Sequence, residues 1–190
     1  MTFTSVWENR NEKSLFLCEG IRCQILINRD INNSNKSSPR FVKRMISNSK
    51  SEFESNIVSL MSMIKEPTER IYSSVNNRNF KKSLRVFKQK QLDNEFMSDE
   101  QNFDFHKNIY NNWFSSLCSP ESRDSRLFLI DLDTENDSQQ CHEKLSHLTD
   151  VKFMYKTKKG WHFVTDPFNH QLFLFDSCEI KKDGMVLVFY

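Results

Sequence analysis

Two aspartates separated by one residue follow a short apolar run in the second half of the chain. Residues 127–132 have the apolar character of a buried strand, and Asp131 and Asp133 stand at its end. Side chains two residues apart on a strand point to the same face, so we expect these carboxylates side by side. Like charges this close repel each other, and a divalent metal ion is a common way to neutralise them. The alternative interpretation is a polar turn after the strand, because Asp is frequent in turns and helix caps.

A second group of residues that could take part in chemistry surrounds His162. This histidine lies in a predicted strand, residues 161–165, just after Lys158, Lys159 and Gly160. Alternation along the strand places Lys158, Gly160 and His162 on one face. Glycine permits close approach, while ammonium and imidazole groups donate hydrogen bonds to phosphate. A lone histidine in a strand is more often structural, but this strand is predicted to lie beside the carboxylate strand.

The elements that would position these two groups follow a β-α-β-β-α-β order. The predicted elements are a strand at 127–132, a helix at 138–148, strands at 152–157 and 161–165, a short helix at 169–174 and a strand at 185–190. This split unit closes as a four-stranded antiparallel sheet with helices on one face, and its first and third strands are central neighbours. The predicted fold class is therefore α+β.

The first 125 residues predict an α/β unit that packs against this sheet, so that the 190 residues form one domain. Spacing of apolar residues and turn signals predict strands at 15–18, 23–27 and 70–75, a polar loop at 28–39, and helices at 50–65, 80–96 and 98–117.

Positive charge is concentrated in one segment of this unit. The formal net charge of the chain is only +2, yet residues 70–91 contain seven basic residues and no acidic one. Lys and Arg that neutralise phosphates supply most non-specific affinity for nucleic acid, which makes this segment a candidate contact surface. The residues singled out are Arg78, Lys81, Lys82 and Arg85. A solvated helix face, balanced by the acidic residues that follow it, is the alternative interpretation.

Composition excludes several classes of protein. The five cysteines include no Cys-x-x-Cys pair, so we expect neither a disulfide framework nor a structural zinc site. No signal peptide and no apolar run of about 18 residues is present, which argues against secretion and membrane insertion. We expect a cytoplasmic protein with reduced thiols. The absence of alanine and the abundance of Asn, Ser and Lys suggest an AT-rich coding sequence, as in many phages and mobile elements.

Taken together, the motifs resemble those of the archaeo-eukaryotic primase superfamily, the primase-polymerases. An apolar strand ending in Asp-x-Asp corresponds to residues 129–133, and a small-x-His motif corresponds to Gly160-Trp161-His162. The third motif, an apolar residue followed by an acid, is best matched by Phe175-Asp176, with Asp183 as the rival. The resemblance covers about residues 70–190, and it implies an RRM-like unit at about 126–190. The third acid lies closer to the other motifs than is usual in the family.

The resemblance implies metal-dependent nucleotidyl transfer in DNA or RNA synthesis, in a bacterial or phage-infected host cell. Asp131, Asp133 and Asp176 would hold Mg²⁺ or Mn²⁺, and His162 would act with the two aspartates in catalysis. Lys158, Lys159, Gly160 and His162 would bind a nucleoside triphosphate, while Arg78 and the basic helix would carry a DNA or RNA strand. No zinc-binding or helicase element is present, so other replication proteins would be partners.

Two other functions are compatible with the same residues. One is a non-catalytic nucleic-acid-binding protein on an RRM-like sheet, and the other is a metal-dependent nuclease. The Lys181-Lys182-Asp183-Gly184 stretch also matches the motif around the nucleotide-accepting lysine of ligases. Because only six residues follow it and Asp-Gly is a strong hairpin signal, we interpret it as a turn.

Overall fold

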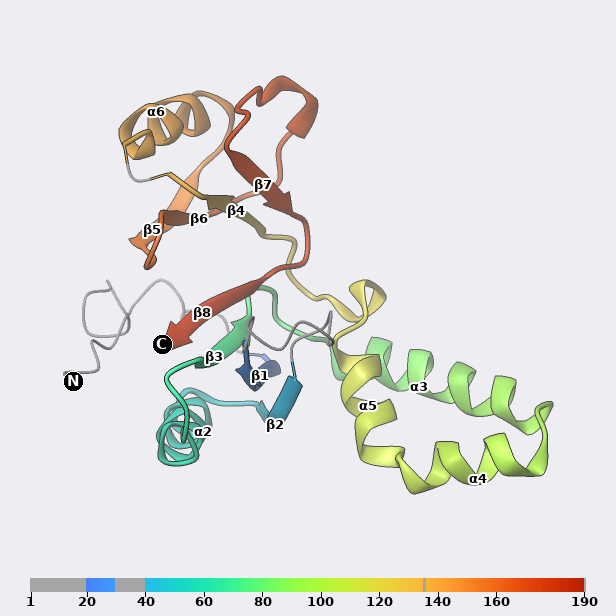
Figure 1. Ribbon diagram of the computed structural model, residues 1–190. Helices are drawn as coiled ribbons and strands as arrows, with labels where there is room; N and C mark the ends of the chain where they lie inside the picture. The colour runs from blue at the N-terminus through green and yellow to red at the C-terminus, as the bar shows by residue number, and fades with distance from the viewer. Residues whose placement is uncertain (1–19, 30–39, 135, 190) are drawn as a thin grey trace.

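Two antiparallel four-stranded sheets form the body of the protein (Figure 1). The computed structural model describes residues 20–29, 40–134 and 136–189. The first sheet has the order β2-β1-β3-β8 and is formed by β1 (Arg22–Asn28), β2 (Arg40–Ser47), β3 (Glu69–Ser74) and β8 (Met185–Phe189). The second has the order β5-β6-β4-β7 and is formed by β4 (Phe128–Leu132), β5 (Val151–Lys156), β6 (Trp161–Thr165) and β7 (Cys178–Lys181).

Five α-helices accompany the sheets in the described residues, which confirms the predicted α+β class. They are α2 (Lys50–Ser62), α3 (Phe80–Glu95), α4 (Asp99–Lys107), α5 (Ile109–Leu117) and α6 (Ser138–Leu148), with 3₁₀ turns η1 (Pro120–Ser122) and η2 (His170–Leu172). Side-chain oxygens cap α2, α3 and α4 at their N-termini, through Ser49, Asn79 and Ser98. These caps satisfy backbone donors that have no partner inside the helix.

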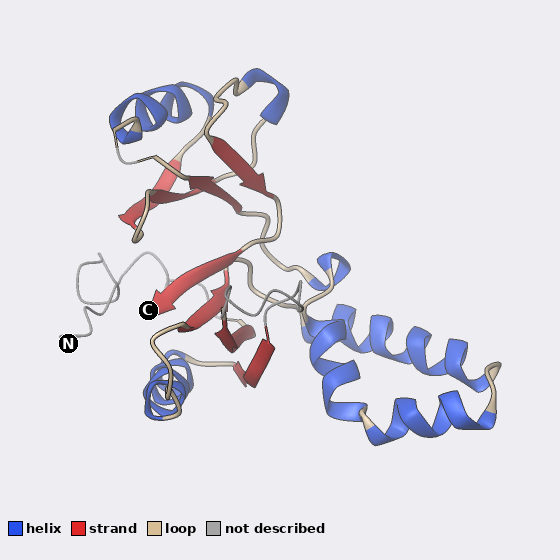
Figure 2. Ribbon diagram, in the orientation of Figure 1, coloured by secondary structure: helices blue, strands red, loops and turns tan. Residues whose placement is uncertain are grey.

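The core is divided into three clusters by the two sheets. Leu26, Ile71 and Val188 pack the first sheet against α2, whereas the outer face of the second sheet packs against Cys141 and Leu145 of α6. The third cluster fills the space between the sheets and includes buried residues from both. Helix α2, the first sheet, the second sheet and α6 therefore form four successive layers (Figure 2).

Alternation along β4 explains why its carboxylate points between the sheets. Phe128, Ile130 and Leu132 pack in the cluster with α6, whereas Leu129 packs in the cluster between the sheets. Because successive side chains on a strand point to opposite faces, Asp131 shares the inner face with Leu129. The apolar pattern that makes β4 a buried strand thus also aims its acidic residue.

Helices α3, α4 and α5 form an arm that extends to one side of the sheets (Figure 1). The helix predicted at 98–117 is in fact two helices, because the chain leaves helical geometry at Asn108. The Asn108 amide donates to the carbonyl of Asp104, and the Asn112 amide donates to the carbonyl of Phe105. The Asp104 carbonyl also keeps its backbone bond from the Asn108 N–H, whereas at Phe105 a side chain satisfies a carbonyl that a continuous helix would bond through its backbone.

The C-terminal part departs from the predicted order in two places. The strand predicted at 185–190 was expected to complete the second sheet, but β8 pairs with β3 in the first sheet. Its expected place is taken by β7, which pairs with β4 and was not predicted. Residues Lys182 and Asp183 do form a turn, but it connects the two sheets and closes no hairpin. The helix predicted at 169–174 is only the η2 turn.

The remaining predictions differ from the structure mainly at element ends. The strands at 23–27 and 70–75 and the helices at 50–65 and 80–96 are confirmed within a few residues, and β2 was not predicted. The strand at 15–18 and most of the loop at 28–39 lie outside the described residues. None of the described helices combines the length and the apolar character needed to cross a membrane.

Candidate functional site

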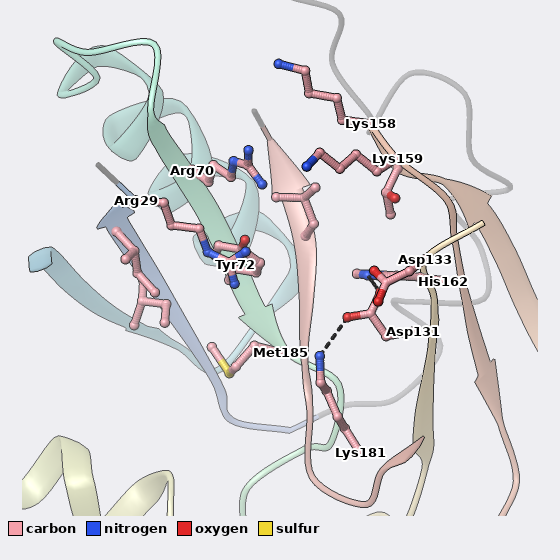
Figure 3. A pocket seen from close by; sticks show the side chains of 14 residues that line it. Arg29, Arg70, Tyr72, Asp131, Asp133, Lys158, Lys159, His162, Lys181 and Met185 are labelled. Carbon is pink, nitrogen blue, oxygen red and sulfur yellow. Dashed lines mark hydrogen bonds and ion pairs between the residues drawn. The ribbon is translucent and has the colours of Figure 1, made fainter. Parts of the chain in front are cut away.

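A cavity of about 390 Å³ opens between the inner faces of the two sheets. Asp131, Asp133 and His162 line it from the second sheet, and Arg29 and Arg70 line it from the first (Figure 3). The hairpin that joins β5 and β6 adds Thr157, Lys158 and Lys159, while Lys181 contributes from the end of β7. Residues that are far apart in the chain therefore meet in one cavity.

The register of the second sheet places His162 directly opposite Asp131. The His162 Nε2 atom lies 2.9 Å from Asp131 Oδ1, and the imidazole is almost fully buried. The expectation that this histidine lies beside the carboxylate strand is confirmed. Strands β4 and β6 are the two central strands of the sheet, so the pair has a neighbouring strand on each side.

Tyr155 and Asp131 hold the two ring nitrogens of His162. The Tyr155 hydroxyl lies 2.6 Å from His162 Nδ1, and it accepts a hydrogen bond of 3.1 Å from the backbone N–H of Leu187. Because the Asp131 carboxylate only accepts, Nε2 carries the proton in a neutral ring, and Nδ1 then accepts from the Tyr155 hydroxyl. The chain from β8 through Tyr155 to Asp131 therefore orients the imidazole.

Lys181 supplies a positive charge to the other oxygen of Asp131. Its Nζ atom lies 2.6 Å from Asp131 Oδ2 and 2.9 Å from Glu179 Oε2. Burial by itself would raise the pKa of Asp131, but hydrogen bonds from His162 and Lys181 outweigh it and hold that pKa well below its usual range. For Lys181, burial lowers the pKa, and its hydrogen bonds to Asp131 and Glu179 more than offset this and raise it. Asp131 is therefore an anion with two built-in donors.

Asp133 lines the same cavity and differs from Asp131 in its surroundings. It is exposed, and it forms no ion pair with any residue that the structure describes. The two aspartates do reach one cavity, as predicted from their spacing. Hydrogen bonds from His162 and Lys181 to Asp131 reduce the expected repulsion between the two carboxylates.

Neither candidate for the third acid lies with these two carboxylates. Asp176 is exposed in the turn before β7 and is not a cavity residue, and Asp183 is bound to Arg78. The acid nearest in register is Glu179, which pairs with Asp131 across β7 and β4. Within the described residues, no three His, Cys, Asp or Glu side chains are grouped as a metal site.

The lysines and the glycine of the small-x-His segment have separate positions. Lys158 and Lys159 are exposed and line the cavity. Gly160 is buried and does not line it, and a Cβ atom there would lie 1.8 Å from the carbonyl oxygen of Leu132. We therefore correct the predicted role of Gly160 in nucleotide binding: its missing side chain allows the β5–β6 hairpin to pack against the end of β4.

The four basic residues singled out near α3 also separate into two kinds. Arg78 is only 3% exposed and contacts Asp183 with both terminal nitrogens, at 2.9 and 3.0 Å. A buried side chain engaged in this way is not free to contact a nucleic-acid backbone, so its predicted role is corrected to a structural one. Lys81, Lys82 and Arg85 are exposed on α3, outside the cavity, and Lys82 donates to the carbonyl of Arg123.

Five residues of the site were not recognised as such in the sequence: Arg29, Arg70, Tyr155, Glu179 and Lys181. Arg70 stood out only as part of the basic segment, and Lys181 only as part of a ligase-like motif. The alternation of Glu179 and Lys181 along one strand was a usable signal. Their pairing with Asp131 was not, because nothing local indicates which strand β7 joins.

Comparisons of this chain with protein-family models, with curated proteins and with solved structures found no match.

Proposed function

We propose that the protein is a metal-dependent nucleotidyltransferase that acts on nucleic acid, in the manner of a primase-polymerase. The observation that supports this most is the cavity, in which Asp131 and Asp133 lie with basic side chains from both sheets that form no ion pair with the described residues. A site for a nucleotide and its divalent metal ion needs carboxylates that hold the metal and cations that bind the phosphates. The volume of about 390 Å³ falls within the range of small-molecule sites.

The topology of the second sheet supports the RRM-like part of this proposal. Numbered along the unit, its strands stand in the order second, third, first, fourth, with β4 and β6 at the centre. Helix α6 covers the outer face, and the site lies on the inner one. The second helix of the unit is reduced to the η2 turn. We therefore propose an RRM-like unit at about 126–181, closed by β7, while β8 returns to the first sheet.

The carboxylate groups in the cavity are suited to bind Mg²⁺ or Mn²⁺. Carboxylate oxygens are the ligands that these ions prefer, and Asp131 and Asp133 would supply them. The position between Asp131 and Glu179 already holds a cation, the ammonium of Lys181, which a metal ion would replace. When bound, the metal would neutralise phosphate charge and make an attacking hydroxyl group more acidic.

The residues of the chain would bind and orient the nucleotide. His162, held by Tyr155, presents Nε2–H at the cavity wall, where it can donate to Asp131 or to a phosphate oxygen. Lys158 and Lys159 lie in the loop between β5 and β6, and their long side chains would contact the same phosphates. Binding of a nucleic-acid strand by Lys81, Lys82 and Arg85 stays a prediction; their replacement by Ala should weaken binding and flatten its salt dependence.

Primer extension tests this proposal directly. A labelled primer on a template is incubated with Mn²⁺ or Mg²⁺, with and without nucleoside triphosphates. We expect extension by the wild type and a loss of about 100-fold or more in Asp133→Asn, comparable to the removal of a transition-state contact. Asp133 is exposed and unpaired among the described residues, so this variant should keep its fold. Shortening of the primer would instead indicate a nuclease, and an unchanged primer would refute the enzyme.

The ion pair of Lys181 favours a second candidate, a protein that binds phosphates without catalysis. A lysine that neutralises Asp131 makes a metal ion unnecessary for stability. In that case Mn²⁺ would not raise the melting temperature of the wild type, whereas phosphate ligands would still raise the melting temperature. If the protein is a nucleotidyltransferase, both Mn²⁺ and phosphate ligands should raise its melting temperature.

A further inference from the structure

Four basic side chains line the cavity without a carboxylate partner. Arg29, Arg70, Lys158 and Lys159 form no ion pair with any residue in the described part of the chain. With Lys181, which pairs with Asp131 and Glu179, five basic side chains stand against three carboxylates, those of Asp131, Asp133 and Glu179. The excess of two positive charges at this site equals the formal net charge of the entire chain, +2.

The first sheet aims two of these cations at the cavity. Arg70 lies opposite Ile27 in the β1–β3 register, and Arg29 follows Ile27 by two residues. The Arg29 N–H bonds the carbonyl of Thr68 at 3.1 Å, which continues the ladder beyond β1. Both arginines therefore project from the inner face, as diagonal neighbours close enough to bind one ligand. The Arg29 guanidinium lies 5.2 Å from the centre of the Tyr72 ring, a cation–π contact that restricts it.

Lys158 and Lys159 approach the same space from the second sheet (Figure 3). The cations thus stand on two opposite walls, and the carboxylate of Asp131 is turned toward Lys181 and His162 instead. Unpaired charges of one sign around a cavity repel each other, and a ligand with several negative charges relieves that repulsion. Guanidinium groups match phosphate oxygens in a bidentate geometry.

We propose that Arg29 and Arg70 form, with Lys158 and Lys159, a polyphosphate subsite that binds the phosphate tail of a nucleotide without help from a metal ion. The size of the cavity favours this ligand over a nucleic-acid strand, because about 390 Å³ accommodates one nucleotide and not an extended backbone. The subsite deepens the proposed function, on which the nucleotide part of this assignment rests. It also gives the first sheet a role in that function.

The test measures binding of sodium tripolyphosphate to the full chain by calorimetry in EDTA. We expect the wild type to bind it and Arg29→Gln/Arg70→Gln to bind about tenfold more weakly or worse, since each lost contact is a hydrogen bond between charged groups. Arg126→Gln is the matched control, because Arg126 is an exposed arginine outside the cavity and has no role in the proposed function. It should bind like the wild type. Thermal melts report whether each variant is folded.

Three results would overturn the subsite. These are no binding of tripolyphosphate by the wild type, equal loss in the Arg126 control, or unchanged affinity in the double variant. If the double variant binds tripolyphosphate with unchanged affinity but no longer binds an oligothymidine without terminal phosphates, these arginines contact a nucleic-acid strand instead. Failure of the proposed function is distinguishable, because primer extension measures it separately. Tripolyphosphate binding that depends on the arginines, without any primer extension, would support the subsite and refute the polymerase activity.

Discussion

Replacement of Lys181 by Met should increase the affinity of the site for divalent metal ions. The Lys181 ammonium lies 2.6 Å from Asp131 Oδ2, and at an effective dielectric constant of about 20 their gross attraction is about 6 kcal/mol. Desolvation and solvent offset most of this, because the side chains of Lys181 and Asp131 are 34% and 24% exposed. A net contribution of about 1 to 2 kcal/mol remains, in line with hydrogen bonds between charged groups.

A metal ion that binds Asp131 must displace this ammonium, so its apparent affinity is reduced by the same free energy. Since 1.4 kcal/mol corresponds to a factor of ten, Lys181→Met should bind Mn²⁺ about 5 to 30 times more tightly. Without metal, the variant should be less stable by about 1 to 2 kcal/mol, because Asp131 and Glu179 lose the cation between them.

Thermal melts over a Mn²⁺ titration measure both effects. Lys182→Met is the matched control, since Lys182 is the exposed neighbour in the following turn, outside the cavity. It should respond to Mn²⁺ like the wild type. Equal Mn²⁺ midpoints for Lys181→Met and the wild type would show that the ammonium does not occupy a metal position.

Three further predictions follow from contacts around the site. Tyr155→Phe removes the hydroxyl on His162 Nδ1 and should lower the free energy of unfolding by about 1 to 2 kcal/mol. It should also change the tautomer signals of His162 in nitrogen NMR spectra; unchanged signals would contradict its orienting role. Arg78→Met leaves the Asp183 carboxylate without its buried partner and should cost about 3 to 5 kcal/mol in urea unfolding, whereas a cost under about 1 kcal/mol would be that of a surface pair. The pKa of Asp131 is depressed in the folded state, so its contribution to stability is present above its unfolded pKa of about 3.9 and is lost as the pH falls below that value. Urea unfolding between about pH 6 and 2 should therefore show a smaller loss in Asp131→Asn than in the wild type, and equal losses would refute the assignment.

Local patterns predicted the elements that carry the carboxylates and the histidine. The apolar run before Asp131 and the alternation around His162 each depend on residues a few positions apart. Helix periodicity located α2 and α3 for the same reason. It did not locate the break at Asn108, because apolar residues continue on both sides of it and the side-chain hydrogen bonds that end α4 depend on the folded geometry.

The sequence did not reveal which strands pair with each other. The apolar run of β8 indicates a strand, but it does not indicate that this strand pairs with β3, more than a hundred residues away, in preference to β4. The same uncertainty concealed β7, whose four residues are too short for a clear pattern. Because β7 was not predicted, Lys181 and Glu179 could not be assigned as partners of Asp131. Asp176 was predicted as the third acid, but it lies in the turn before β7, outside the cavity.

The sequence by itself determined which residues could do chemistry, since residue type and spacing along one strand decide which side chains share a face. Only the tertiary structure decided which charges meet. It buried Arg78 against Asp183, and it turned Arg29 and Arg70 toward Lys158 and Lys159. The physical reason is that electrostatic partners are chosen by distance in space, and distance between two sheets is set by packing and register that no single segment encodes.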